Sequence, residues 1–190
     1  MRIAIFASGN GSNFQVLAEA FRSGAIKGEL RLLFCDQENA KVRARADQLK
    51  VKEVSFSPKS FESKKYYEQA ILDLLREEAI DLIVLAGYMR IIGPTLLSQF
   101  ERRIINIHPS LLPHFPGLHG VRDAFEAGVR ETGITIHYVD TGVDTGPIIR
   151  QEKVQRADED TLESLEAKIH AVEHRVYPEV LAEIIVNLEV

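Results

Sequence analysis

Two polar side chains that could perform chemistry stand two residues apart in the stretch NIHPSLLPHFPG, residues 106–117, directly after a run of isoleucines. Alternate residues of a strand share a face, so Asn106 and His108 should point the same way. Ile105 and Ile107 should then point to the opposite face. An amide can donate hydrogen bonds without a change of charge, and an imidazole can exchange a proton near neutral pH. The pair is typical of a site that stabilises an oxyanion and delivers a proton, and interior polar groups that cap a loop are the alternative interpretation.

Two carboxylates follow a second apolar run. The stretch DTGVDTG, residues 140–146, places Asp140 and Asp144 on a glycine-bearing loop directly after ITIHYV. If Asp144 reaches His108, its negative charge would favour the charged form of the imidazole. The alternative interpretation treats both aspartates as turn residues, because aspartate side chains commonly hydrogen-bond to nearby backbone in tight turns.

A glycine-rich stretch, SGNGSN at residues 8–13, lies between a predicted strand and a predicted helix. Glycines there let backbone N–H groups approach a phosphate, and the start of a helix adds partial positive charge. The stretch is not the dinucleotide fingerprint, because Asn13 stands where the third glycine would be, and it lacks the lysine of a P-loop. It therefore predicts either an anion-binding loop or an ordinary tight turn with Ser12 as the helix N-cap.

The stretch HAVEH, residues 170–174, matches the H-x-x-E-H pattern of inverted zinc peptidases. His170 and His174 would lie one helical turn apart, as a zinc site requires. A catalytic zinc site needs a third protein ligand, which the sequence does not offer clearly, so we expect no metal. The helix face that carries His170 and Glu173 is better suited to recognition of a polar ligand.

These residues need a scaffold, and the pattern of apolar runs predicts one. Strands are predicted over residues 2–8, 29–35, 52–56, 81–87, 103–108, 134–139 and 147–154. Helices are predicted between the glycine loop and Gly24 and over residues 41–50, 60–79, 94–100, 121–128 and 161–188, with a kink or a restart at Pro178. Alternating strands and helices predict a largely parallel, three-layer α/β fold, and we expect residues 1–190 to form a single domain.

Composition limits the possible functions. The chain has 190 residues, 45% of them hydrophobic, and one cysteine, so no intrachain disulfide can form and we expect a cytoplasmic protein. The net charge is -5 with acidic and basic residues interleaved, which argues against a nucleic-acid partner. Since no apolar run reaches the length of a membrane span, we also expect no membrane association.

Five stretches together stand in the order and approximate spacing of one known family. They are GNGSN at 9–13, AGYMRII at 86–92, NIHPSLLPHFPGLH at 106–119, GITIHYVDTGVDTGPII at 133–149 and VEHRVYP at 172–178. On these motifs, the chain resembles the folate-dependent glycinamide ribonucleotide formyltransferases of purine synthesis over essentially its whole length. The resemblance implies a Rossmann-like formyltransferase fold whose seven-stranded sheet, mostly parallel and partly mixed, carries the site at its strand ends.

The resemblance also implies two ligand sites. The ribonucleotide is expected at Gly11, Ser12, Asn13, His170 and Glu173. The folate is expected along Lys64, Met89, Arg90, Ile91, Ile92, Asn106, Asp140, Thr141, Gly142, Val143 and Asp144. Lys64 stands where this family often has arginine, and His170 stands where it often has glutamine. Lys64 keeps the charge but loses the two-pronged contact that arginine makes with a carboxylate, and His170 would make phosphate affinity sensitive to pH.

The reaction implied is direct attack of the glycinamide amine on the formyl carbon of 10-formyltetrahydrofolate, through a tetrahedral intermediate and without a metal. Asn106 and protonated His108 would donate to its oxyanion, and Asp144 would keep His108 protonated. The alternatives are a formyltetrahydrofolate hydrolase or a methionyl-tRNA formyltransferase, whose extra domains 190 residues would not accommodate, and a non-catalytic nucleotide-binding module. The expected partners are these small molecules alone, and the sequence leaves monomer and homodimer open.

Overall fold

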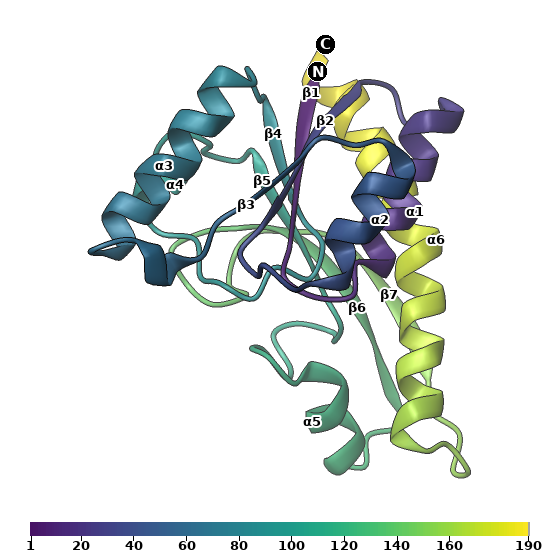
Figure 1. Ribbon diagram of the computed structural model, residues 1–190. Coiled ribbons are helices and arrows are strands. Elements are labelled where there is room, and N and C mark those ends of the chain that lie inside the picture. The colour runs from purple at the N-terminus through teal and green to yellow at the C-terminus, as the bar shows by residue number, and fades with distance from the viewer. Residues whose placement is uncertain (190) are drawn as a thin grey trace.

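The computed structural model describes residues 1–189, and within them seven strands form one sheet (Figure 1). The strands are β1 (Arg2–Ala7), β2 (Glu29–Cys35), β3 (Glu53–Ser55), β4 (Leu82–Leu85), β5 (Ile104–His108), β6 (Glu131–Tyr138) and β7 (Ile148–Gln155). Their order across the sheet is β3-β2-β1-β4-β5-β6-β7. Neighbours from β3 to β5 are parallel, whereas β6 is antiparallel to both β5 and β7. The predicted mostly parallel, partly mixed α/β sheet is confirmed.

Helices cover both faces of the sheet and complete the three layers. They are α1 (Ser12–Ser23), α2 (Lys41–Leu49), α3 (Lys64–Glu77), α4 (Pro94–Leu97), α5 (Gly120–Glu126) and α6 (Leu162–Glu189), with a 3-10 turn η1 (Pro58–Ser60). Figure 1 shows α3 and α4 on one side of the sheet and α1, α2 and α6 on the other. Side chains of neighbouring strand residues point into opposite layers. Ile105 packs with α1, α2 and α6, whereas Ile104 packs with α3 and α4.

The helix predicted over residues 60–79 begins later than expected. The Ser63 side chain accepts a hydrogen bond from the Tyr66 N–H at 3.4 Å and caps α3, so the helix begins at Lys64. The segment before it forms η1 instead, with Ser57 as its cap. The helix predicted over residues 94–100 is confined to α4, which begins at Pro94 as expected.

The restart expected at Pro178 is wrong, because α6 continues through this position to Glu189. Proline removes one backbone donor from a helix interior. Buried neighbours on both sides, Tyr177 and Leu181, hold the helix against the sheet, and the Tyr177 hydroxyl donates to the Leu85 carbonyl at 2.9 Å. Packing therefore compensates for the missing hydrogen bond.

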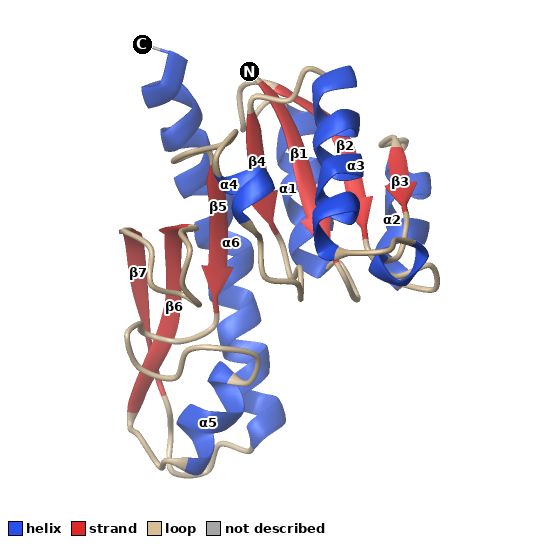
Figure 2. Ribbon diagram, turned by 90° about the vertical axis from the view of Figure 1, so that its left-hand side faces the viewer, coloured by secondary structure: helices blue, strands red, loops and turns tan. Residues whose placement is uncertain are grey.

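The antiparallel part of the sheet determines where polar side chains meet. β6 and β7 extend past the ends of the parallel strands, and α6 runs along both parts (Figure 2). The pairing of β5 with β6 sets Asn106 directly opposite His137. Within residues 1–189 no helix combines the length and the apolar character that crossing a membrane requires.

Candidate active site

Asn106 and His108 lie on one face at the end of β5, as strand alternation predicts. Ile105 and Ile107 belong to the apolar cluster on the opposite face. His108 is 3% exposed, so its ring depends on protein partners for hydrogen bonds. The end of this strand therefore presents an amide and an imidazole side by side.

Asp144 reaches this pair from the loop between β6 and β7. Its Oδ2 lies 3.4 Å from His108 Nδ1, and its Oδ1 lies 3.6 Å from His137 Nε2. The Gly117 N–H donates to the same carboxylate at 2.8 Å. Burial would raise the pKa of Asp144, but the hydrogen bond with His137, the Gly117 amide and the positive charge of His108 together lower it below its ordinary value of 3.8. The carboxylate is thus held ionised between two imidazoles.

The two ring nitrogens of His108 both face oxygen acceptors. Nε2 lies 2.8 Å from the Phe115 carbonyl, and Nδ1 faces the Asp144 carboxylate. Since a carbonyl can only accept, Nε2 carries a hydrogen in this geometry. Donation from Nε2 to a ligand therefore requires the ring to release the Phe115 carbonyl.

His137 is a site residue that the sequence reasoning missed. Its Nδ1 lies 2.9 Å from the Tyr138 carbonyl and therefore carries a hydrogen. Its Nε2 lies 3.2 Å from the Asn106 amide nitrogen and also faces Asp144. With a proton on Nε2 the ring can donate to Asp144, and without one it can accept from Asn106. No local pattern in the sequence marks this histidine, because only the antiparallel pairing of β5 with β6 sets His137 opposite Asn106.

A cavity of about 320 Å³ opens above this cluster. Of the residues expected to contact folate, those lining it are Met89, Arg90, Ile91, Ile92, Asn106, Asp140, Gly142, Val143 and Asp144. Thr141 and Lys64 do not line it, and the Lys64 ammonium lies 3.7 Å from Glu68 Oε1. Large apolar side chains are exposed at the cavity: Met89, Ile91, Leu118 and Val143. Exposed apolar groups around a polar floor are typical of a pocket for a partly aromatic ligand.

The two aspartates of the loop behave differently. Asp140 accepts hydrogen bonds from the Gly142 N–H at 3.0 Å and from the Thr145 hydroxyl at 2.7 Å, so its side chain stabilises the turn. Asp144 instead turns its carboxylate toward His108. The turn-residue interpretation therefore describes Asp140 and fails for Asp144.

The glycine-rich loop lies at the start of α1. Gly11 adopts a left-handed conformation with φ of 78° and serves as the N-cap, so the expectation of Ser12 as the cap is wrong. A side chain at position 11 would collide with Val42 of α2. Glycine therefore brings the backbone and α2 closer than another residue would allow, and no side chain caps the first N–H groups of α1.

Residues from the two ends of the chain meet beside this loop. The Asn13 amide donates to Glu173 Oε2 at 3.0 Å, and His170 Nδ1 lies 2.9 Å from the same oxygen. Glu173 is 4% exposed, and within residues 1–189 the buried Oδ1 of Asn13 has no hydrogen-bond partner. The hydrogen bond to Glu173 raises the pKa of His170 above its ordinary value of 6.5. This end of the site offers the imidazole of His170 and the carboxylate of Glu173 beside the start of α1.

His174 extends this group along α6 without forming a metal site. Its ring stacks against His170 with centroids 6.2 Å apart, and burial lowers its pKa. Among the described residues, no group of three or more His, Cys, Asp or Glu side chains is arranged to hold a metal ion.

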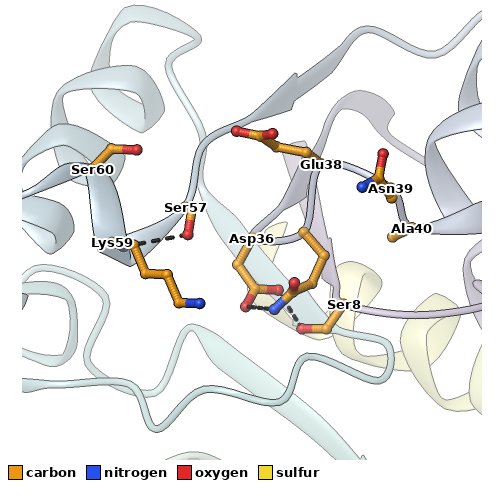
Figure 3. A pocket seen from close by; sticks show the side chains of 9 residues that line it. Ser8, Asp36, Glu38, Asn39, Ala40, Ser57, Lys59 and Ser60 are labelled. Carbon is orange, nitrogen blue, oxygen red and sulfur yellow. Dashed lines mark hydrogen bonds between the residues drawn. The ribbon is translucent and has the colours of Figure 1, made fainter.

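A second, polar cavity of about 640 Å³ was not anticipated from the sequence. It is lined by residues after β1, β2 and β3, including Ser8, Asp36, Asn39, Ser57 and Lys59. Figure 3 shows Ser8 and Asp36 together at one side of it and Lys59 at the other. Asp36 is 1% exposed and accepts a hydrogen bond from the Ser8 hydroxyl at 2.5 Å.

Comparison with known proteins gives consistent results. The model of the formyl transferase family matches residues 1–181. The chain is 49% identical over 184 residues to phosphoribosylglycinamide formyltransferase of Bacillus subtilis (strain 168), which covers 97% of this chain and 94% of that relative. The chain is also 37% identical over 182 residues to the enzyme of the same name from Escherichia coli (strain K12). That match covers 96% of this chain and 86% of that relative. The crystal structure of phosphoribosylglycinamide formyltransferase from Streptococcus pneumoniae TIGR4 matches with a TM-score of 0.92 at 53% identity, over 97% of this chain and 98% of that chain.

Proposed function

The chain belongs to the formyl transferase family, and from this premise we propose that it transfers a formyl group from 10-formyltetrahydrofolate to the amine of glycinamide ribonucleotide in purine biosynthesis. The observation that carries the proposal is the contact of Asp144 with His108 and His137 at the floor of an apolar-rimmed cavity. A carboxylate, two imidazoles and an amide in contact can stabilise an oxyanion and move a proton.

The cavity suits the folate part of the cosubstrate. Met89, Ile91, Leu118 and Val143 offer apolar surface to the flat ring system, and the loop from Asp140 to Asp144 offers polar atoms to the edge of the ring. Lys64 would lie near the carboxylates of the benzoyl-glutamate part. It does not line the cavity, so its contact would be with the portion of the ligand that extends outward.

The ribonucleotide would bind beside the glycine-rich loop. The uncapped N–H groups of Gly11, Ser12 and Asn13 at the start of α1 favour a phosphate. His170 in its charged form would add attraction, and Glu173 would accept hydrogen bonds from ribose hydroxyls.

The side chains divide the chemistry between them. Attack of the amine places negative charge on the formyl oxygen, and Asn106 can stabilise it because one of its two amide hydrogens remains available beyond the contact with His137. His108 becomes a second donor when its Nε2–H turns from Phe115 to the oxyanion, while the Asp144 carboxylate lies beside its Nδ1. A proton from the attacking amine can pass through water to the leaving nitrogen, with His137 and Asp144 as nearby acceptors.

The remaining expectations follow the same reasoning. We propose small-molecule partners only, a monomer or homodimer, a cytoplasmic location and one domain over residues 1–190. The single sheet formed by all seven strands supports the last of these. Cys35 is buried and free among the described residues, which suits a reducing compartment.

A substrate-dependence assay tests the proposal. The purified protein mixed with 10-formyltetrahydrofolate and glycinamide ribonucleotide should release deformylated folate only when both are present. Release without the ribonucleotide would favour the hydrolase alternative. Absence of release at every pH tested would favour the non-catalytic nucleotide-binding module.

A further inference from the structure

One wall of the cavity is the segment between β4 and α4, residues 86–93. Met89 and Ile91 are 59% and 62% exposed and Arg90 between them is exposed as well, whereas Tyr88 and Ile92, which flank these three residues, are 9% and 5% exposed. The buried Tyr88 hydroxyl is hydrogen-bonded to that of Tyr67 at 2.9 Å. Because a ligand in the cavity would contact this segment along its length, the position of its backbone decides the shape of the wall.

The first half of the segment is held by residues that do not line this cavity. The Met89 N–H donates to Ser8 Oγ at 2.9 Å, and the Ser8 hydroxyl donates to Asp36 Oδ1. The other oxygen of Asp36 accepts from Arg90 Nε at 2.7 Å. One buried carboxylate at the end of β2 thus fixes the backbone at position 89 through Ser8 and the side chain at position 90 directly.

The second half of the segment is held by another buried carboxylate. The Gly93 N–H donates to Glu68 Oε1 at 2.6 Å, and Glu68 is 3% exposed. The Lys64 ammonium lies 3.7 Å from the same oxygen. With both ends held, the residues between them can rearrange only if one of the two carboxylates releases its partners.

We propose that Asp36 is a positioning residue for the folate-type cosubstrate, and that the Arg90 side chain acts through Asp36 instead of binding the ligand. The inference rests on the proposed function and deepens it. Asp36 lines the second cavity and not the one above His108, and its carboxylate is occupied by Ser8, Gln37 and Arg90. Its loss would free the guanidinium and leave the Ser8 hydroxyl, which accepts from the Met89 N–H, without its own acceptor. The wall would then lose its fixed position while Asn106, His108 and Asp144 keep theirs.

The test separates the Michaelis constants of the two substrates. Asp36→Asn should raise the KM for 10-formyltetrahydrofolate roughly tenfold, the usual scale for a hydrogen bond to a charged group. The KM for the ribonucleotide and kcat should change by less than about twofold. A merely structural loss would give the opposite pattern, with a lower kcat and both KM values unchanged. Ser8→Ala keeps the Arg90 bridge and should raise the folate KM by about threefold, which covers the case in which Asp36→Asn folds poorly.

A matched control is available on the neighbouring strand. Glu53 in β3 bonds to Arg43 Nε at 2.8 Å and lines neither cavity. Glu53→Gln removes an acid–arginine pair of the same kind and should leave both KM values unchanged. An equal rise in the folate KM in this control would overturn the positioning role of Asp36.

A double-mutant cycle tests the role of Arg90. If Arg90 acts through Asp36, the variant with both Asp36→Asn and Arg90→Gln should show a folate KM no higher than that of the worse single variant. If the increase in folate KM of the double variant equals the product of the two single increases, the guanidinium binds the ligand independently and the proposal is wrong. If the wild type turns over both substrates and Asp36→Asn has the same folate KM, only the positioning role is contradicted. If the wild type itself shows no turnover, the proposed function is contradicted as well.

Discussion

The two ends of the proposed site are built in different ways. In the antiparallel part of the sheet, β5 and β6 set Asn106 opposite His137, and Asp144 closes the group from the following loop. In the parallel part, the start of α1 offers backbone N–H groups, supported by the contact of Asn13 with Glu173. Under the proposed function, chemistry at the first end would depend on individual side-chain atoms, whereas binding at the second would depend largely on backbone.

This difference predicts how each end responds to substitution. A side chain at the antiparallel end should be irreplaceable, because each ring nitrogen and carboxylate oxygen there has a specific partner. A side chain at the glycine loop should be partly replaceable, because backbone N–H groups remain when it is changed. Four variants test the comparison, in order of decreasing effect.

The largest effect is expected for Asn106→Ala. Loss of a preorganised donor to an oxyanion typically costs about 3 kcal/mol of transition-state stabilisation, so kcat should fall roughly 100-fold or more. Steady-state kinetics with both substrates measure it, and Asn39→Ala, an exposed asparagine in the second cavity, is the control. A kcat within threefold of wild type would remove Asn106 from the chemistry.

Asp144→Asn should have the next largest effect. The substitution keeps the shape and removes the charge that faces His108 and His137, so we expect kcat to fall about 100-fold at neutral pH, the lower range for loss of acid–base function. The KM for the ribonucleotide should stay nearly constant, because Asp144 lies at the other end of the site. A change confined to that KM would contradict the division between the two ends.

The same variant gives a readout in acid. The pKa of Asp144 in the folded protein lies below 3.8, so its ionised form stabilises the fold above the ordinary value and this contribution is lost as pH falls through the lowered pKa. The difference in unfolding free energy between wild type and Asp144→Asn should therefore shrink below pH 3.8. Denaturant titrations at pH 7 and in acid measure it, and a constant difference would show that the charge contributes nothing to folding.

The sequence predicted the fold well because its central strands β1, β4 and β5 are short apolar runs that are almost entirely buried. Its errors concern helix ends and tertiary compensation. The helix predicted from residue 60 begins at Lys64, because Ser63 caps it and residues 58–60 form the 3-10 turn η1. Pro178 does not end α6, because buried residues on both sides secure the helix against the sheet.

The candidate site was predicted unevenly for a similar reason. Alternation along β5 predicted that Asn106 and His108 share a face, and the structure contains the contact of Asp144 with His108. Within ITIHYV, however, His137 resembles an ordinary strand residue, and only the pairing with β5 sets it opposite Asn106. Nor does any local pattern indicate that the Arg90 guanidinium turns toward Asp36, since the two residues lie on different strand ends.

A smaller effect is expected at the glycine-loop end, from His170→Gln. The hydrogen bond to Glu173 raises the pKa of His170, so the charged form persists above pH 6.5 and is lost as pH rises further. The ribonucleotide KM of the wild type should therefore increase about threefold across this rise, as for an exposed charge interaction. The KM of His170→Gln should be flat over the same range, and a parallel rise in both proteins would assign the pH dependence to another group.

The smallest effect is expected for Lys64→Arg, which examines the rim of the cavity. Lys64 is 56% exposed and lies 3.7 Å from Glu68, so its ammonium is available to a ligand carboxylate only in competition with Glu68. Arginine can contact both carboxylates with its five donors, and the folate KM should fall by about twofold. Lys65→Arg, one residue along and also exposed, controls for general charge effects. If the folate KM instead rose in Lys64→Arg alone, the main role of Lys64 would be to keep Glu68 on the Gly93 N–H. The rim would then resemble the antiparallel end, where a particular side chain is required.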